Sequence, residues 1–311
     1  MDKVYIGIDV SKESLEVFIP GRKTAPFFNT ETDIARLLKT LHDLGNAHVV
    51  CEATGGYERP LARALWQAAI PVSIVNPRQT HDYARSLGIL AKTDRIDAQC
   101  LSRYGHANEP SPTAQPSAAE RDLAELLDWR THLLDTKSRL RNRLEHLENP
   151  QLRGQAEALL NWLGAQIEEL GKQISAKVGA DEAMKAKAER MKQVPGVSEL
   201  TAAGLLAHLP ELGALNRREA AALAGLAPLN NDSGKMKGKR FIRGGRHKVR
   251  KLLYMAAMVH SRFDPVAKAR CKALRDRGKP WKVVITALMR HLLILLNHML
   301  KNPNFALNPI P

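Results

Sequence analysis

The spacing of hydrophobic residues divides the chain into three regions. Over residues 1–108, short apolar runs alternate with stretches in which apolar side chains recur every three or four positions, which is typical of alternating strands and helices. The predicted strands are residues 4–10, 14–20, 47–53 and 70–77, and the predicted helices are residues 30–45, 57–68 and 93–105. The first region is therefore predicted to be an α/β domain.

A helical arm is predicted next. Residues 108–117 (NEPSPTAQPS) are rich in Pro and Ser and predict a linker. Leucine then recurs at every seventh position, at Leu126, Leu133, Leu140 and Leu147, and Pro150 and Gly154 interrupt the pattern. A second series steps by three and four, at Leu160, Leu163, Ile167, Leu170, Ile174 and Val178. We expect a coiled-coil arm or helical hairpin, within a second domain of residues 109–192, that packs either on itself or on another subunit.

The remaining region, residues 193–311, is predicted to be mainly helical. Residues 191–209 place a Val-Pro-Gly-Val turn before a helix capped by Ser198. This resembles a helix-hairpin-helix, in which turn amides face a DNA phosphate, although an ordinary Pro-Gly turn explains the same residues. Further helical patterns cover residues 216–230, 247–263 and 278–300. The last of these contains an Arg, a His and an Asn, which favours a buried or interface helix over a membrane span.

The distribution of charge indicates a polyanionic partner. The net charge is +15, yet residues 235–311 hold 19 Lys and Arg against two Asp, so residues 1–234 are slightly acidic. A concentrated basic region releases counterions from a phosphate backbone, and apolar residues between the cations favour a folded surface over a solvated basic tail. The candidate nucleic-acid contacts are Lys235, Lys237, Lys239, Arg240, Arg243, Arg246, Lys248 and Arg250.

Cysteine usage and the N-terminal residues indicate the compartment. The three cysteines show no CxxC spacing, which argues against a disulfide framework or a zinc site and fits a reducing cytosol. The first ten residues have no signal-peptide pattern. With 44% hydrophobic and 25% charged residues, the chain is expected to be a soluble, cytoplasmic protein associated with the nucleoid and not with a membrane.

Four acids form a candidate metal site. Asp9 and Glu52 each end a predicted strand, and the pair Asp94 and Asp97 lies on one face at the start of a predicted helix. Phosphoryl transfer with two Mg²⁺ ions requires hard oxygen ligands, and carboxylates from separate elements supply them. Acids in this order are typical of ribonuclease-H-like nuclease domains. These four residues are the candidate catalytic and metal-binding residues.

Other interpretations of these acids remain open. Asp9 alone could be a turn residue, Glu52 a helix-capping acid, and the helical pair first-turn acids favoured by the helix dipole. Actin-like proteins and sugar kinases also begin with a "GID" strand, but their next turn carries small residues that cradle phosphate. Here that turn is the bulkier, charged VSKES, and residues 54–58 (TGGYE) are the one candidate for a second phosphate loop. We therefore expect no nucleotide cofactor.

Ser233 is the candidate nucleophile. A lone loop serine is usually a turn or cap residue. Gly234 after it leaves the backbone unhindered, and six Lys or Arg residues follow within 13 positions. A serine that attacks a phosphodiester needs such exposure, and it needs cations to stabilise the charged transition state.

The motifs together resemble a known family. GIDVSK (residues 7–12), CEATGGY (51–57), KTDRIDAQCLSRY (92–104), VPGVSELTAAGLLAHL (194–209) and ALAGLAPLNNDSGKMKGKRFIRGGRHKVRKLLYMAA (222–257) occur in this order. This arrangement is similar to the DEDD transposases of bacterial insertion sequences, the insertion-sequence one-ten family, which includes bridge-RNA-guided recombinases. The similarity covers nearly the whole chain.

The resemblance implies a fold and a mechanism. It implies a RuvC-like, ribonuclease-H-like N-terminal domain whose acids Asp9, Glu52, Asp94 and Asp97 hold Mg²⁺, with Mn²⁺ as a possible substitute. It implies a helical C-terminal transposase domain whose Ser233 forms a covalent link to DNA. Donor and target DNA, a structured noncoding guide RNA, and dimers that pair into a tetramer are the implied partners. The active site would join carboxylates of one subunit to the serine of another.

Two further functions stay open at this point. A hydrolytic nuclease, for example one that resolves junctions, would cut with metal-activated water and use Ser233 as a phosphate contact. A non-catalytic nucleic-acid-binding protein would carry the same fold without needing its acids.

Overall fold

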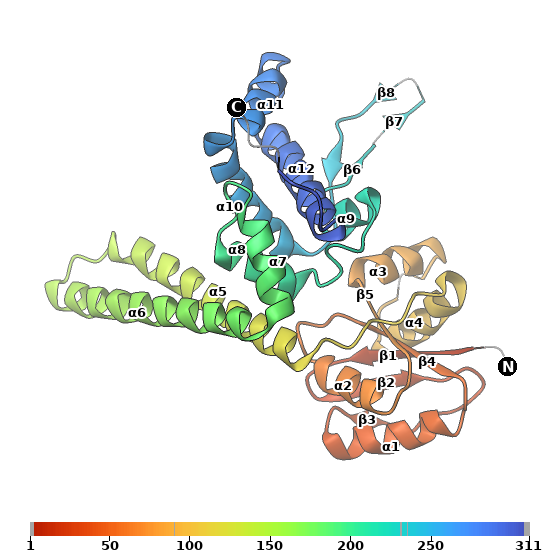
Figure 1. Ribbon diagram of the computed structural model, residues 1–311. Helices are drawn as coiled ribbons and strands as arrows, with labels where there is room; N and C mark the ends of the chain where they lie inside the picture. The colour runs from red at the N-terminus through yellow and green to blue at the C-terminus, as the bar shows by residue number, and fades with distance from the viewer. Residues whose placement is uncertain (1–2, 90, 231, 235, 308–311) are drawn as a thin grey trace. The chain divides into compact units, whose positions relative to one another are not determined.

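The structure is a computed structural model that describes residues 3–89, 91–230, 232–234 and 236–307. The chain forms two compact units, Met1–Gln115 and Pro116–Pro311. In Figure 1 the first unit runs from red to yellow and the second from yellow to blue.

A five-stranded mixed sheet forms the centre of the first unit. Its strands are β1 (Val4–Val10), β2 (Ser14–Phe18), β3 (Phe27–Phe28), β4 (Ala47–Glu52) and β5 (Val72–Val75). The strand order is β3-β2-β1-β4-β5, with β1–β2 and β2–β3 antiparallel and β1–β4 and β4–β5 parallel. This order and these directions are those of a ribonuclease-H-like sheet, so the predicted fold class of the N-terminal region is confirmed at the level of topology.

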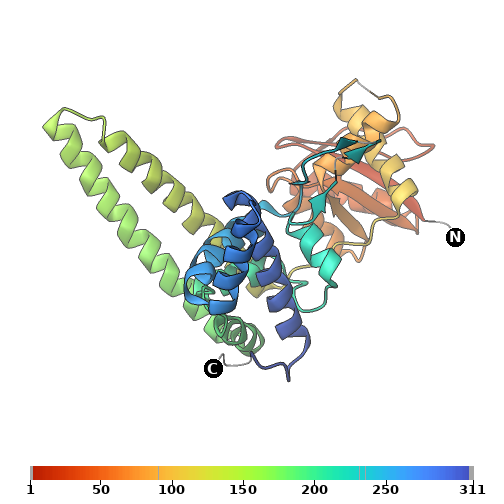
Figure 2. The ribbon, with the colours of Figure 1, turned by 90° about the horizontal axis from the view of Figure 1, so that it is seen from above.

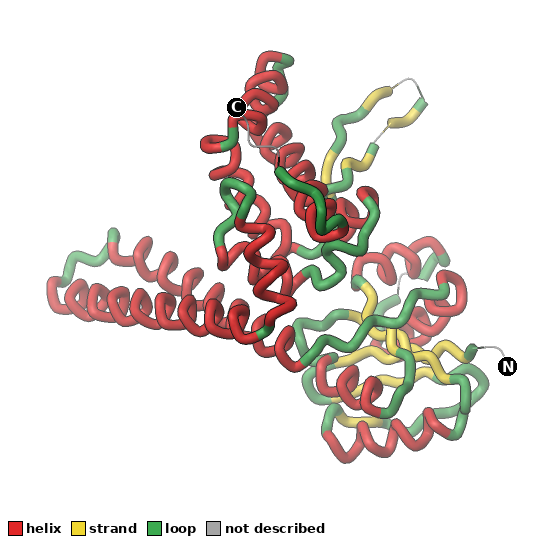
Figure 3. Tube along the Cα trace, viewed as in Figure 1, coloured by secondary structure: helices red, strands yellow, loops and turns green. Residues whose placement is uncertain are grey.

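Helices cover both faces of this sheet (Figure 3). They are α1 (Glu31–His42), α2 (Arg59–Gln67), α3 (Pro77–Ser86) and α4 (Asp94–Asn108). Side chains of α1 and α2 share one hydrophobic cluster with Ile6, Ile8 and Val49. Tyr5 and Val50, which point to the opposite face, share another cluster with Leu101 of α4. The alternation of side chains along each strand therefore assigns odd-numbered residues of β1 and even-numbered residues of β4 to the α4 face.

The Pro- and Ser-rich stretch that follows α4 is held against β5. Thr113 donates its backbone N–H to the Val72 carbonyl (2.8 Å), and its hydroxyl accepts from the Ile74 N–H (2.9 Å). The Trp66 indole donates to the Thr113 carbonyl (2.9 Å). Composition predicts a free linker here, but these bonds satisfy the outer edge of β5, so the stretch up to Gln115 belongs to the first unit.

The predicted arm is a pair of long helices in the second unit. Helices α5 (Ala118–Leu144) and α6 (Pro150–Ala180) run side by side away from the other helices of that unit (Figures 1 and 2). Leu133 of α5 is buried against α6 residues of the second apolar series, namely Leu163, Ile167 and Leu170. The structure confirms a helical hairpin, and supercoiling of its helices stays a prediction. Leu147 lies in the turn after α5, and Gly154 lies inside α6.

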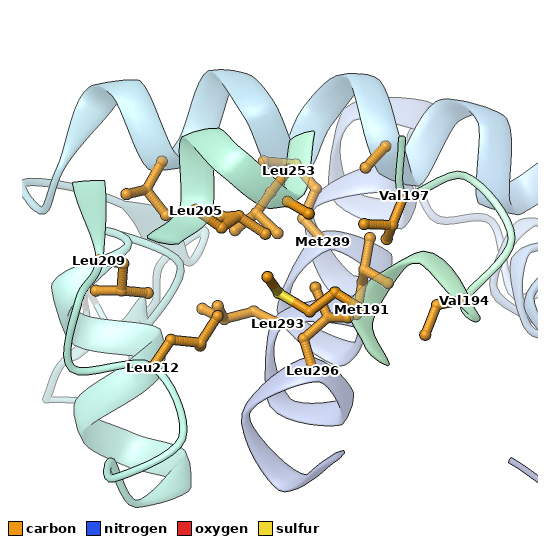
Figure 4. Close-up of a cluster of buried hydrophobic side chains, with 14 of the residues drawn as sticks. Met191, Val194, Val197, Leu205, Leu209, Leu212, Leu253, Met289, Leu293 and Leu296 are labelled. Carbon is orange, nitrogen blue, oxygen red and sulfur yellow. The ribbon is translucent and has the colours of Figure 1, made fainter. Parts of the chain in front are cut away.

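The helical body of the second unit has one large core (Figure 4). Its helices are α7 (Glu182–Lys192), α8 (Glu199–His208), α9 (Arg217–Leu223), α10 (His247–Phe263), α11 (Pro265–Asp276) and α12 (Trp281–Lys301). Met191, Leu205, Leu253 and Leu293 meet in this core, and all are fully buried. Burial of one such side chain stabilises a fold by roughly 1.5–3 kcal/mol.

The Val-Pro-Gly-Val turn between α7 and α8 packs against α10. Gly196 has φ +95°, and a Cβ at this position would meet the Ala256 carbonyl at 2.6 Å. The His260 ring nitrogen Nδ1 lies 2.8 Å from the Pro195 carbonyl oxygen. Ser198 caps α8 as predicted, by accepting from the Thr201 N–H. These contacts give the glycine a packing role, because only Gly allows this close approach.

Helix α12 is the one helix in the described part of the chain with the length and apolar composition to cross a membrane. Half of its most apolar window is buried within the protein. Asn297, near the C-terminal end of the helix, is buried; it accepts from the Gly213 N–H (2.8 Å) and donates to the Leu215 carbonyl (2.7 Å). A buried amide with both partners supplied by its own fold is what a core helix requires.

Candidate active site and nucleic-acid interface

The ends of two parallel strands bring the first two predicted acids to one edge of the sheet. Strands β1 and β4 are parallel, and Ile8 pairs with Cys51, so Asp9 and Glu52 are the next residues along each strand. Asp9 is an odd-numbered residue of β1 and Glu52 an even-numbered residue of β4, so both side chains lie on the sheet face that α4 covers. Both are half-buried.

Helix α4 brings the second pair of acids to the same edge. Thr93 caps the helix by accepting from the Ile96 N–H, which places Asp94 and Asp97 in the first turn. The helix lies close to β1 because Gly7 has no side chain: a Cβ there would meet the Ala98 carbonyl at 1.9 Å. Gly7 therefore sets the distance between the strand that carries Asp9 and the helix that carries Asp97.

The predicted acids influence one another's ionisation. Burial first, and then the charges of three acids, together raise the pKa of Asp9 to about 6, against a smaller opposing effect of Lys92; the three acids are Asp97, Asp94 and Glu52. Burial also raises the pKa of Glu52 and that of Asp97. Such shifts mark a site where negative charge is concentrated and poorly compensated.

Glu52 has a hydrogen-bond partner that the sequence did not indicate. The Thr80 hydroxyl, on α3, makes a short hydrogen bond with Glu52 Oε1 and lies 2.9 Å from the Pro77 carbonyl oxygen. Thr80 is buried. The bond lowers the pKa of Glu52 and so favours its ionised form against burial. Thr80 and Lys92 are the two residues at this edge that sequence reasoning missed, because neither stands in a distinctive local pattern.

The residues at this edge suit a divalent cation chemically. The four acids are hard carboxylate oxygen donors, which Mg²⁺ and Mn²⁺ prefer. Burial, and after it repulsion by neighbouring carboxylates, raises the pKa of Asp9, Glu52 and Asp97, and a cation would relieve that repulsion. Within the described residues, however, no three acidic, His or Cys side chains lie close enough to share one ion. The four acids are thus neighbours, and ion binding requires their side chains to draw closer.

The Gly-Gly loop after β4 is occupied by its own glutamate. Glu58 Oε2 accepts from the Thr54 N–H (3.0 Å), the Thr54 hydroxyl (3.2 Å) and the Gly56 N–H (2.8 Å). These donors are the ones that a phosphate-binding loop would present to a nucleotide. A loop already satisfied by a carboxylate does not suit that purpose, which counts against the kinase interpretation.

Ser233 lies in the second unit, on an exposed two-stranded ladder. Strand β7 (Asp232–Ser233) pairs with β8 (Met236–Lys237), and Ser233 lies opposite Met236. Gly234, at φ +55°, begins the turn, and a Cβ there would meet nothing within 4 Å. A second short ladder pairs β6 (Pro228–Leu229) with β9 (Phe241–Ile242), and Figure 1 shows β6 below β7 and β8. The serine is therefore exposed and sterically unhindered, as a nucleophile requires.

Three of the predicted nucleic-acid contacts have partners inside their own unit. Arg246 forms a two-pronged ion pair with Glu211, with both N–O distances 2.6 Å. Arg250 donates to the Gly244 carbonyl (2.6 Å), and Lys248 pairs with Asp128 of the arm (2.6 Å). The pair with Arg246 helps to lower the pKa of Glu211. These cations hold the loop and the arm to the helical body.

The other predicted contacts differ in exposure and description. Lys239, Arg240 and Arg243 are exposed and form no ion pair with another described residue. Lys235 lies outside the described residues, and so does the side chain of Lys237. Among the side chains that the structure describes, the cations nearest Ser233 in sequence that are available to a phosphate are thus Lys239, Arg240 and Arg243.

Comparisons with known proteins agree with this arrangement. A family profile described as "Transposase", of the DEDD type, matches residues 6–148, and one described as "Transposase IS116/IS110/IS902 family" matches residues 188–272. A DEDD site implies dependence on a divalent metal ion. The pilin gene-inverting proteins of Moraxella bovis and Moraxella lacunata are each 32% identical over 308 residues, which span 95% of this chain and 95% of each relative.

A solved structure of Thermus thermophilus RuvC also matches, at 17% identity and a TM-score of 0.26. It covers 35% of this chain and 99% of RuvC. The ribonuclease-H-like assignment rests on the strand order and not on this low score. Both profiles describe transposases, the two relatives match along nearly the whole chain, and transposases act on DNA. The chain belongs to the IS110 family of transposases, and it is a DNA transposase or recombinase.

Proposed function

We propose that this transposase cuts and rejoins DNA through a covalent link to Ser233, with Asp9, Glu52, Asp94 and Asp97 as ligands of a divalent metal, Mg²⁺ in the first place. The observation that carries the proposal is the convergence of these acids at one sheet edge, with the pKa of Asp9 raised to about 6. The covalent link to Ser233 is supported by the exposure of that serine and by the exposed cations that follow it in sequence.

Each residue has a definite part in this chemistry. The Ser233 oxygen forms a bond to phosphorus, its proton passes to solvent, and the phosphorus–oxygen bond to one deoxyribose breaks. The released DNA hydroxyl takes up a proton. Exposed Lys239, Arg240 and Arg243 bind the phosphate oxygens on which charge develops. A bound divalent metal would stabilise the same charge and the leaving oxygen.

The covalent link explains how strands can be rejoined. The phosphoserine ester keeps the energy of the broken phosphodiester, so attack by another DNA hydroxyl regenerates Ser233 without ATP. This fits a first unit whose Gly-Gly loop binds its own Glu58. The names of the Moraxella relatives, which invert a pilin gene, describe an event that breaks and rejoins strands, and we extend that class of reaction to this chain.

Three further features of the proposal concern assembly. The carboxylates and the serine belong to different units of the chain. We place them in one composite site made by two subunits, within dimers that pair into tetramers through contacts that include the arm. A structured noncoding RNA selects donor and target DNA. The resemblance to guided recombinases supports these points, and RNA that copurifies with the protein and matches DNA beside its gene is the test for the last.

Trapping of the covalent intermediate tests the mechanism. Purified protein is incubated with Mg²⁺ and a plasmid that carries its gene with flanking DNA, then denatured and separated by size. Wild-type protein and Ser111→Ala, which removes an exposed serine hydroxyl of the first unit, are expected to yield a protein–DNA adduct. Ser233→Ala should yield none. Efficient DNA cleavage by Ser233→Ala without an adduct would instead establish a hydrolytic nuclease, and unchanged activity in Asp97→Asn would contradict both enzymatic mechanisms.

A further inference from the structure

A pocket of about 630 Å³ opens beside the carboxylates of the first unit. Glu52 and Asp97 form its acidic end. Apart from these two acids and Thr80, its polar lining is mainly basic and comes from α3 and the residues after it. The basic residues are Arg78, His81, Arg85 and Lys92. We call this the α3 pocket.

The basic side chains of the α3 pocket share one helix face. Arg78, His81 and Arg85 are spaced by three and four residues, which places them along one side of α3. All three are exposed. Arg78, Arg85 and Lys92 form no ion pair within 4 Å of any described residue. Their charges are therefore available to a ligand.

The opposite side of α3 is fixed to the rest of the unit. Thr80 is buried and bonded to Glu52. Tyr83 packs edge-on against Tyr104 of α4, with ring centroids 5.5 Å apart, and its hydroxyl donates to the Arg103 carbonyl (3.3 Å). Because these contacts hold the helix in place, the arginines keep a fixed position relative to Glu52 and Asp97.

We propose that the α3 pocket binds the DNA strand that is being cut, with Arg78 and Arg85 on the phosphates that flank the one at the carboxylates. This inference rests on the proposed function, since it identifies the strand that reaches that site. Seven residues of helix span about 10.5 Å, which equals about three nucleotides at the roughly 3.4 Å axial spacing of one strand in duplex DNA and fewer nucleotides of an extended strand. Arginine grips phosphate with two parallel hydrogen bonds, which suits a strand whose bases are read elsewhere.

The mixed charge of the α3 pocket argues for a strand and not for a free anion. A small anion would be repelled by Glu52 and Asp97 at one end of the pocket. An extended strand can put one phosphate there, where a divalent cation held by the carboxylates would offset the repulsion, and still put its neighbours on the arginines. Lys92 also lines the α3 pocket, and its positive charge acts to lower the pKa of Asp9, Glu52 and Asp97 against the causes that raise it.

The first test measures binding without chemistry. The affinity of the full-length protein for a fluorescent 20-nucleotide single-stranded DNA is titrated in EDTA at several salt concentrations. Arg78→Ala/Arg85→Ala should bind about fivefold or more weakly, and its salt slope should fall by about 1.4, because two phosphate contacts are lost. The charge-matched control is Lys23→Ala/Arg63→Ala, which removes two exposed cations of the same unit outside the pocket and should match wild type. Equal slopes for the two double variants would overturn the proposal.

The second test locates the strand in the unaltered protein and so does not depend on the folding of a variant. A 20-nucleotide DNA with photoreactive thiothymidines is cross-linked to wild-type protein, and the attached peptides are identified by mass spectrometry. Cross-links within residues 77–89 are expected. Their absence would overturn the α3 pocket as a DNA site. Cross-links and arginine dependence with RNA of the same sequence, but not with DNA, would assign the pocket to the guide RNA and equally overturn the proposal.

These outcomes separate the inference from the proposed mechanism. Binding in EDTA needs neither Ser233 nor metal, so Ser233→Ala should bind the oligonucleotide as wild type does. If Ser233→Ala forms no adduct while the α3 variants bind normally, the serine mechanism stands and the pocket assignment fails. If the α3 variants lose binding while Ser233→Ala still forms an adduct, the reverse holds.

Discussion

The carboxylate of Glu52 is positioned by a hydroxyl group, that of Thr80, and this bond can be removed alone. Thr80→Val keeps the shape of the side chain but leaves Glu52 without its partner, whereas Thr80→Ser keeps the hydroxyl. Groups that orient metal ligands typically contribute 10- to 100-fold to metal affinity or activity. We expect Thr80→Val to slow adduct formation and to raise the Mg²⁺ concentration for half-maximal rate by about 10-fold or more. Thr80→Ser should restore both; if it does not, Thr80 has only a packing role.

The raised pKa of Asp9 predicts a pH-dependent cost to the fold. Its folded value, about 6, exceeds the ordinary value of 3.8, so the folded state holds the proton more tightly. The stabilisation from the protonated form is complete below pH 3.8 and is lost as pH rises through 6. Asp9→Asn stays neutral, and in EDTA at pH 7.5 we expect it to be about 1 kcal/mol more stable than wild type, once the shift is reduced for partial exposure.

Thermal unfolding across pH measures this difference. It should shrink as pH falls and vanish below about pH 4, where both side chains are neutral. Gln79→Ala, which removes an exposed side chain that does not titrate from α3, is the control and should show no such trend. A stability difference for Asp9→Asn that is constant with pH would contradict the shift.

At the residue scale, local patterns predicted the acids but not their partners. Asp9 and Glu52 stand at the ends of apolar strands, and parallel strands that end together explain why they meet. The partners of Thr80 and Arg246 lie 28 and 35 residues away in sequence, so only packing of separate elements reveals them. A count of local charge predicts Arg246 as a phosphate contact, and it gives no sign of the ion pair with Glu211 that the structure shows.

At the scale of elements, two adjacent leucines of the arm allow a matched comparison. Leu133 is 6% exposed and packs against α6, while Leu134 beside it is 38% exposed. Leu133→Asp would bury a charge between the two helices, and we expect it to lower the free energy of unfolding by about 3 kcal/mol or more. Leu134→Asp should cost less than about 1 kcal/mol. Urea unfolding followed by circular dichroism and limited proteolysis of the arm provides the measurement.

The outcome of that comparison also bears on the arm's partner. If Leu133→Asp makes the arm susceptible to protease while Leu134→Asp does not, the two helices of the arm pack on each other as the structure shows. If Leu134→Asp instead abolishes self-association with the hairpin intact, its exposed side chain lies at a subunit contact. Equal resistance of both variants to protease would contradict the packing of Leu133.

Periodicity predicted most helices and strands but not their ends. The heptad series identified α5, yet the helix ends at Leu144, before the last leucine of the series, because Asn149 and Pro150 start a new helix. The Pro- and Ser-rich stretch was correctly free of helix, but its hydrogen bonds to β5 depend on the unpaired edge of a sheet that composition cannot reveal. The local pattern of residues therefore predicts whether a segment is helix, strand or loop, whereas the element that it contacts depends on the topology of the whole fold.

At the scale of the whole molecule, the proposed chemistry is divided between two units, and this division can be tested by mixing variants. Ser233→Ala retains the carboxylates, and Asp9→Asn retains the serine; neither alone should form an adduct. In a composite site built from two subunits, a mixed dimer has one complete site. Random mixing gives half of the dimers this composition, so about a quarter of the wild-type adduct is expected.

The location of the adduct makes the test specific. If the two variants carry tags of different size, the DNA should be attached only to the Asp9→Asn chain, because that chain supplies the nucleophile while its partner supplies the carboxylates. Ser233→Ala mixed with Asp97→Asn should behave in the same way, whereas Asp9→Asn mixed with Asp97→Asn should yield nothing, since each chain's defect lies in the same half-site. Adduct in that last mixture would mean that the carboxylates of two chains act together. No adduct in any mixture of two folded, associating variants would place serine and carboxylates of one chain in the same site.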